Sequence, residues 1–299
     1  MKYHFISSIA IPFLLLIVGT FSYLVILNNW NFEIASYSIF IFTLVYILFL
    51  EQVIPLKKHW TTTKKMFLTD IKHLFFSTAL FDTLGKTFAL SFVIYLQKML
   101  FPSFDFWNSF PFFFSFIFAN LIGEFLPYWY HRISHKGNSN SYMSLLLWKF
   151  HSIHHLPTEM NWFKTNWMHP VNIFFNTFFK MAPLLFFGFS DQIIFSVGVT
   201  HVVIAYLSHA NIRTVKSFWD YLIITPQLHH FHHSKKMEEA KNFGNILPFW
   251  DLIFGTYYNR KGSVKDVGVM KSENSKYPSN NNFIQQIFYP FTVFKDCCN

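Results

Sequence analysis

Most of the 15 histidines in this chain fall into closely spaced groups, and imidazole is a common metal ligand. His131 and His135 form an H-x3-H pair, and two H-x2-H-H triplets follow it. Residues three and four positions apart share a face of a helix, so each group directs its imidazoles one way. Three converging groups would hold two metal ions, since one ion takes about four to six donors. The triplets are His151, His154 and His155, and His229, His232 and His233.

Other readings of the histidines fit less well. Packing so many imidazoles without metal would leave buried polar groups unpaired, at about 1–3 kcal/mol each. A zinc protease motif needs Glu after its first histidine, and Arg132 stands there. A bis-histidine haem would use only two ligands. His230 lies about 100° round a helix from His229 and is set aside. Imidazole suits zinc, copper, iron and nickel alike. Four isolated histidines are treated as ordinary: His4, His59, His73 and His201.

The composition indicates a membrane protein. Hydrophobic residues make up 52% of the chain and charged residues 13%, whereas about a quarter of a soluble domain is charged. The net charge of +9 comes with no nucleic-acid recognition motif, so we expect no nucleic-acid partner. Lysines beside apolar runs instead indicate membrane topology and attraction to anionic lipid.

Apolar runs predict about four transmembrane helices, near residues 5–27, 36–54, 73–97 and 111–130. A further apolar stretch, 171–208, is broken near Gly188 and predicts a helical hairpin or two full spans. The 55–72 loop is rich in lysine, whereas the 28–35 loop has none, so the positive-inside rule places the 55–72 loop in the cytoplasm. All the histidine groups then lie on the cytoplasmic side.

The expected division is transmembrane helices in 1–130, a histidine-rich catalytic region in 131–260 that includes the hairpin, and a tail in 261–299. The tail is polar and expected to be loose, with an apolar patch at 283–294 that could lie on the membrane. The only two cysteines are Cys297 and Cys298. Neighbouring cysteines form no disulfide framework, so nothing demands an oxidising compartment.

The spacing of these motifs resembles the membrane-bound fatty acid hydroxylase and sterol desaturase superfamily. Its first two boxes are similar to Tyr128-Trp129-Tyr130-His131-Arg132-Ile133-Ser134-His135 and Trp148-Lys149-Phe150-His151-Ser152-Ile153-His154-His155. The third is similar to residues 225–233, the closing signature to residues 242–257, and an extra box to Ser208-His209-Ala210-Asn211. The resemblance implies an all-α membrane body under a cytosolic helical cap that holds a dimetal site.

The resemblance also implies the ligands and the chemistry. Nine histidines would bind two iron ions that activate O2: His131, His135, His151, His154, His155, His209, His229, His232 and His233. Zinc can replace iron in a purified sample. No catalytic side chain is expected beyond these ligands. His169 and Asp251 are candidates for a supporting role around the ligands. Glu124 and Asp220 are further acids that could fix ring tautomers.

The implied enzyme is a di-iron oxidoreductase that hydroxylates a membrane lipid or sterol. A desaturase or an ether-lipid monooxygenase on the same scaffold is the alternative, since the motifs serve all of them. A third hypothesis is a histidine-rich membrane protein that binds metal without catalysis. The chain carries no G-x-G-x-x-G motif and no C-x-x-C-H haem site, so an external electron donor is expected: cytochrome b5, ferredoxin or a reductase.

Overall fold

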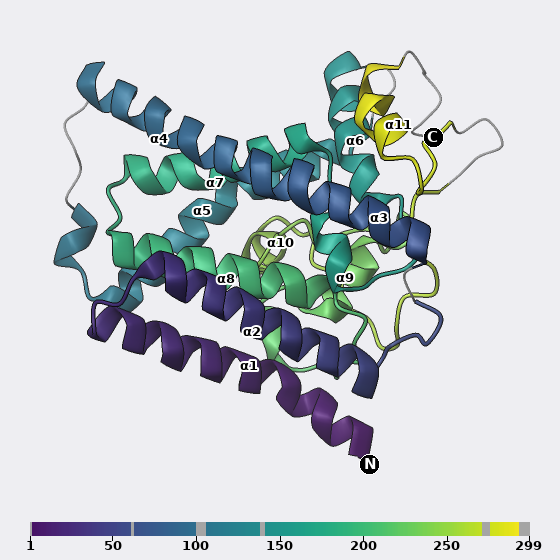
Figure 1. Cartoon of the computed structure of the whole chain (residues 1–299), viewed down its shortest axis with the longest axis horizontal. Helices are drawn as coiled ribbons and strands as arrows, with labels where there is room; N and C mark the ends of the chain where they lie inside the picture. Colours follow the sequence, from purple (N-terminus) through teal and green to yellow (C-terminus); the bar gives the residue numbers. More distant parts are fainter. Residues whose placement is uncertain (1, 61–62, 100–105, 138–140, 271–275, 293–299) are drawn as a thin grey trace.

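The computed structural model describes residues 2–60, 63–99, 106–137, 141–270 and 276–292 (Figure 1). Within these residues the protein is helical, with two isolated β-bridges and no strand. In this described part of the chain, five helical segments are long and apolar enough to cross a membrane. The all-α membrane fold predicted from the sequence is therefore confirmed.

The long helices run along one another in a bundle (Figure 1). The first two are α1 (Lys2–Leu27) and α2 (Phe32–Val53). The third is continuous through α3 (Lys64–Lys72), a π-helical stretch (His73–Leu80) and α4 (Phe81–Met99). The others are α5 (Phe112–Ser134) and α8 (Asp191–His209). Together with α7 (Pro170–Phe186), α8 forms the predicted hairpin, which turns at residues 187–190.

Shorter helices complete the fold. They include α6 (Tyr142–His155), α9 (Pro226–His232), α10 (Phe249–Ile253) and α11 (Phe283–Phe288). Short 3-10 turns lie at Phe106–Ser109, Trp162–Asn166, Phe218–Tyr221 and Tyr289–Phe291. In Figure 1, α6, α9 and α11 lie at the same end of the bundle as α3.

Large apolar side chains cover the outside of the long helices. Leu16, Ile34 and Phe113 are each about two-thirds exposed, with relative accessibilities of 68%, 67% and 66%. Such a surface would be costly in water but is suited to contact with lipid chains. The buried core lies between α1, α2 and α8, and it includes Leu14, Ile47 and Leu207.

The lysine-rich segment after α2 is hydrogen-bonded to the segment that follows α8. Asn211 donates to the carbonyl of Lys57 at 2.9 Å, and the amide of Arg213 donates to the carbonyl of Ile54 at 2.8 Å. The Glu51 carboxylate also accepts from the amides of Trp162 and Asn211. The basic loop and the histidine-bearing segments therefore lie at the same end of the helices, as the topology prediction requires.

The tail differs from expectation, because its described part packs against the body. Val264, Val267 and Val269 are buried, and Ser234 and Val267 form a β-bridge. In α11, Gln286 is fully buried and contacts the ring of His73 at 2.7 Å. The prediction of a loose tail is wrong for these residues, since the valines spaced through its polar sequence supply the contacts. Cys297, Cys298 and the end of the predicted apolar patch lie outside the described residues.

Candidate metal centre

The structure brings the nine predicted histidines into two clusters. The first combines the H-x3-H pair at the end of α5 with residues of α6 and α9. The Nε2 atom of His131 lies 3.1 Å from that of His151 and 3.0 Å from that of His232. The Nε2 atoms of His151 and His155 are 3.0 Å apart. One ring nitrogen from each of five residues lies within 4.8 Å of the others: His131, His135, His151, His155 and His232.

The second cluster is a closed ring of four imidazole nitrogens. The Nε2 atoms of His154 and His209 are 3.2 Å apart, and those of His209 and His229 are 2.9 Å apart. His233 closes the ring at 3.1 Å from both His229 and His154. If two nitrogens each lie about 2.1 Å from one ion and the N–ion–N angle is a right angle, the nitrogens are about 3.0 Å apart. The spacing therefore suits ligands that surround one metal ion.

The two H-x2-H-H triplets are divided between the clusters. In α6, His151 and His155 point into the first cluster and His154 into the second. The third motif makes the opposite division, with His229 and His233 in the second cluster and His232 in the first. Members four residues apart thus stay together, while the remaining member turns to the neighbouring site. Both helices consequently serve both clusters.

Backbone carbonyls fix the tautomers of four rings. The Nδ1 atoms of these rings donate hydrogen bonds of 2.7–3.0 Å, which pair His131 with Phe243, His154 with Trp167, His209 with Ala205 and His232 with Lys241. A neutral imidazole has one N–H, so the Nε2 atoms of these rings carry lone pairs. The contacts His131–His232 and His154–His209 then place two lone pairs face to face. A cation between them resolves that repulsion, so the donor set fits a metal in each cluster.

Burial keeps the histidines outside the spans neutral. It lowers the pKa of His154 to about 3, because the charged ring would lose its hydration. The pKa values of His155 and His233 are also well below the ordinary range for the same reason. Neutral imidazole is the form that binds metal. In the described part of the chain, both clusters consist of imidazoles alone.

The acids proposed as tautomer-fixing partners act on the backbone instead. Asp251 accepts hydrogen bonds from the amides of Phe243 and Gly244 and from the hydroxyl of Thr256. It therefore holds the segment whose Phe243 carbonyl orients His131.

The other two acids behave similarly. Glu124 accepts from the amides of Asn245 and Ile246 in the next stretch of this segment. Asp220 accepts from the Thr225 hydroxyl, at the N-cap of α9. The expectation that these acids contact the clustered imidazole rings directly is therefore wrong. Backbone carbonyls accept from the ring N–H groups instead.

His169 and His230 lie apart from the clusters. His169 caps α7, since its Nδ1 accepts from the amide of Val171 at 3.2 Å, and its Nε2 donates to the Ile287 carbonyl at 3.0 Å. His230 packs edge-on against Trp60, as its position on the helix suggested. Both nitrogens of His169 are thus used in joining α7 to the tail.

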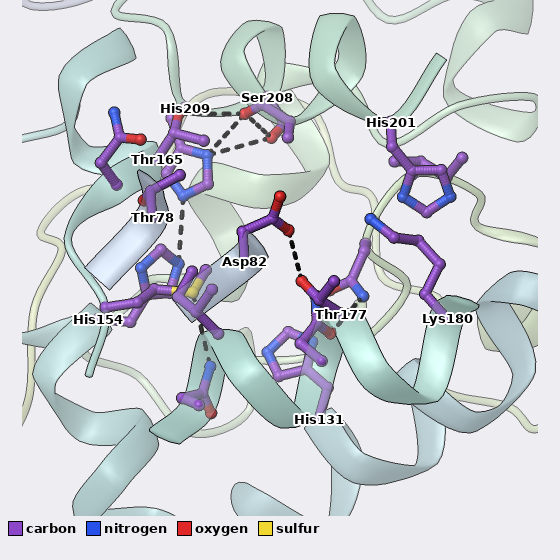
Figure 2. Close-up of a pocket in the computed structure, with 18 of the residues that line it drawn as sticks. Thr78, Asp82, His131, His154, Thr165, Thr177, Lys180, His201, Ser208 and His209 are labelled. Atoms are coloured by element: carbon purple, nitrogen blue, oxygen red, sulfur yellow. Dashed lines mark hydrogen bonds between the residues drawn. The ribbon is translucent and has the colours of Figure 1, made fainter. Parts of the chain in front are cut away.

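A cavity of about 190 Å³ inside the helical bundle is bordered by both clusters. His131 and His151 from the first cluster, and His154, His209 and His229 from the second, line it. Its remaining walls carry polar groups of α4, α7 and α8, which Figure 2 shows facing the same space. Lys180 of this lining was not predicted from the sequence. A charged residue inside an apolar stretch was the signal that could have found it.

Comparisons with known proteins agree with this arrangement. The chain is 26% identical over 260 residues to the ornithine lipid hydroxylase OlsE of Rhizobium tropici, covering 85% of this chain and 75% of that protein. It is also 26% identical over 136 residues to human alkylglycerol monooxygenase, covering 45% of this chain and 28% of that longer protein. No solved structure matches the chain. The fatty acid hydroxylase family model matches residues 116–256, which include all nine clustered histidines. The part of the chain that carries both clusters therefore matches the fatty acid hydroxylase family.

Proposed function

We propose that this protein is an O2-dependent di-iron oxygenase that hydroxylates a C–H bond of a membrane lipid or sterol. The observation that carries the proposal is the pair of imidazole clusters, each with opposed lone pairs, on the wall of a cavity within a membrane-spanning bundle. The similarity to a lipid hydroxylase over 85% of the chain supports hydroxylation.

The side chains divide the work in a definite way. The five histidines of the first cluster would together hold one iron ion, and the four of the second cluster would hold the other. With O2, bound iron supplies the oxidising power that an unactivated C–H bond requires and that side chains lack. The carbonyls of Phe243 and Trp167 orient rings from both clusters. Burial of the rings keeps bulk water away from the reacting groups.

Electrons would arrive through a separate cavity of about 110 Å³ beside the first cluster. His135, His155 and His232 line it, together with Lys136 and Lys235. We infer that an acidic donor such as cytochrome b5, ferredoxin or a reductase docks there, since complementary charge steers association. Turnover should then fall as salt rises, and Lys235→Glu should slow reduction by the donor but not by dithionite. Equal slowing with both reductants would contradict this docking site.

The histidine end of the bundle is proposed to face the cytoplasm. The lysine-rich segment after α2 lies at that end. A cysteine placed at exposed Lys58, in a background with Cys297 and Cys298 changed to serine, should react with an impermeant maleimide in inverted vesicles and not in intact cells. Labelling in intact cells would reverse the orientation.

Untargeted lipid analysis of cells with and without the protein tests the reaction. Hydroxylation gives a lipid heavier by one oxygen atom, and desaturation gives one lighter by two hydrogens. Loss of an ether-linked chain would support the ether-lipid alternative, which the similarity to alkylglycerol monooxygenase favours. The control is His154→Ala, which should remain in the membrane and leave the lipids unchanged. Metal binding without any lipid change would favour the non-catalytic alternative.

A further inference from the structure

The cavity beside the metal clusters carries several polar groups on a mostly apolar surface, and its walls include helices of the membrane body. Asp82 of α4 and Thr177 and Lys180 of α7 line it. Figure 2 shows Lys180 directed into the cavity, toward Asp82 and His201. Amide side chains of α7 and the loop before α10 add to this lining: Asn172, Asn176 and Asn245. Ionisable groups at membrane depth are costly, and those that face a cavity commonly serve a substrate.

The carboxylates nearest the cavity are engaged by groups other than Lys180. The two oxygens of Asp82 are already engaged, one by Lys86 at 2.6 Å and the other by the Thr177 hydroxyl at 2.6 Å. Glu124 receives two backbone amides through one oxygen and lies 3.7 Å from His201 through the other. Among the described residues, no carboxylate lies within 4.0 Å of the Lys180 ammonium. An acidic group in the cavity would therefore give Lys180 the close partner that these residues do not provide.

The volume limits what can enter. About 190 Å³ corresponds to roughly six water molecules at about 30 Å³ each. A whole lipid is far larger, so only one part of it fits beside the clusters. Beside Lys180 and the amides a polar part is favoured over a stretch of acyl chain, because unpaired polar groups against methylenes cost free energy.

We propose that Lys180 binds an acidic group of the lipid substrate, a carboxylate or a phosphate, inside this cavity. The polar end of the lipid, rather than its acyl chain, then lies beside the imidazole clusters. This assignment rests on the proposed function, since it concerns the same cavity. Lys180 is the residue that sets the preference for charge, and the neighbouring amides supply uncharged hydrogen bonds.

The test compares four ligands that share one twelve-carbon chain: dodecanoate, dodecyl phosphate, dodecanol and dodecyltrimethylammonium. Affinity is measured by calorimetry on the full chain in a neutral detergent. The native protein should bind at least one anion about tenfold more tightly than dodecanol, in line with a charge-assisted hydrogen bond. The carboxylate and phosphate arms distinguish the two acidic groups. Lys180→Met should remove the preference, and Lys180→Arg should retain it.

Lys98→Met is the matched control, because Lys98 is an exposed lysine at the far end of α4. It should leave the preference unchanged. Equal affinity of the native chain for all four ligands, or a preference that survives Lys180→Met, would overturn the proposal. If Lys180→Met does not fold, the four affinities of the native chain and of Lys180→Arg still decide it.

Activity separates this inference from the proposed function. Oxidation of an uncharged lipid at the same rate in Lys180→Met and the native chain would leave the oxygenase standing and remove the charge preference. Charge-selective binding without oxygen consumption for any lipid would leave the charge preference standing and remove the oxygenase.

Discussion

The rings of His155 and His233 stack on each other, with centroids 4.3 Å apart and planes inclined by 26°, although they belong to different clusters. The stacked pair is a direct contact between the two sites. Whatever displaces one ring alters the support of the other.

Replacement of His155 should therefore affect the two sites to different extents. His155→Phe keeps an aromatic ring against His233 but removes a donor from the first cluster. We expect about one metal ion per chain in place of about two. His155→Ala also removes the stacking partner and should lower the metal content further. Metal analysis of purified protein measures both variants.

His230→Phe is the control for these variants, since His230 is buried against Trp60 and outside both clusters. It should retain about two ions per chain. A native chain with one ion, or full metal content in His155→Phe, would contradict the assignment of two sites.

Asp251→Ala should weaken metal binding by the first cluster, although it changes no histidine. The change leaves the amides of Phe243 and Gly244 and the hydroxyl of Thr256 without their acceptor. Each unpaired donor costs about 1–3 kcal/mol, and loss of support around a ligand commonly costs about 10–100-fold in metal affinity. Thr256→Val removes only one of the three bonds and should have a smaller effect. Metal titrations that give equal affinities for both variants would argue against this supporting role.

Gly244→Ala should prevent the segment between the third motif and α10 from adopting its folded conformation. An added Cβ would lie 2.1 Å from the Leu247 carbonyl oxygen and 3.0 Å from an Asp251 oxygen. Because the first obstacle is backbone, we expect destabilisation of about 3 kcal/mol or more. Gly198→Ala in α8 meets nothing within 4 Å and should be tolerated. Thermal melting in detergent compares them, and similar melting temperatures would show that the segment can move.

Acid should destabilise the metal-free protein. Burial lowers the pKa of His154 from the ordinary 6.5 to about 3, so between these values the unfolded chain binds more protons than the folded chain. The free energy of unfolding then falls as pH drops below about 6.5. Each such histidine contributes up to about 1.4 kcal/mol per pH unit. Bound metal should protect the rings and hold the melting temperature higher at pH 5. A metal-free melting temperature that is the same at pH 7.5 and pH 5 would refute this account.

The sequence could predict the membrane helices and the gathering of eight of the nine histidines, because both follow from local spacing. His209 was added by the family resemblance. It could not predict that His154 separates from His151 and His155. Three residues on one helix face look like one group until the positions of neighbouring helices are known. The same limit applies to Asp251, whose role depends on backbone amides that only folding places beside it.

The cavity was harder to predict for a different reason. Asp82 and Lys180 lie about a hundred residues apart, and only the packing of α4 against α7 brings them to one space. Gly85 makes that packing possible, since an added Cβ there would lie 2.9 Å from the carbonyl of Phe174. Contacts of this kind depend on tertiary structure and leave little trace in local pattern.

The division of α9 and its cap between the clusters has a consequence for biosynthesis. The first cluster needs His232 and the second needs His233, so they are complete only once residues 232 and 233, respectively, have left the ribosome. By then all five candidate spans have been synthesised. Complete clusters therefore form late, in a chain whose spans have all been made, so any metal ion that needs a complete cluster would be bound after the spans are synthesised.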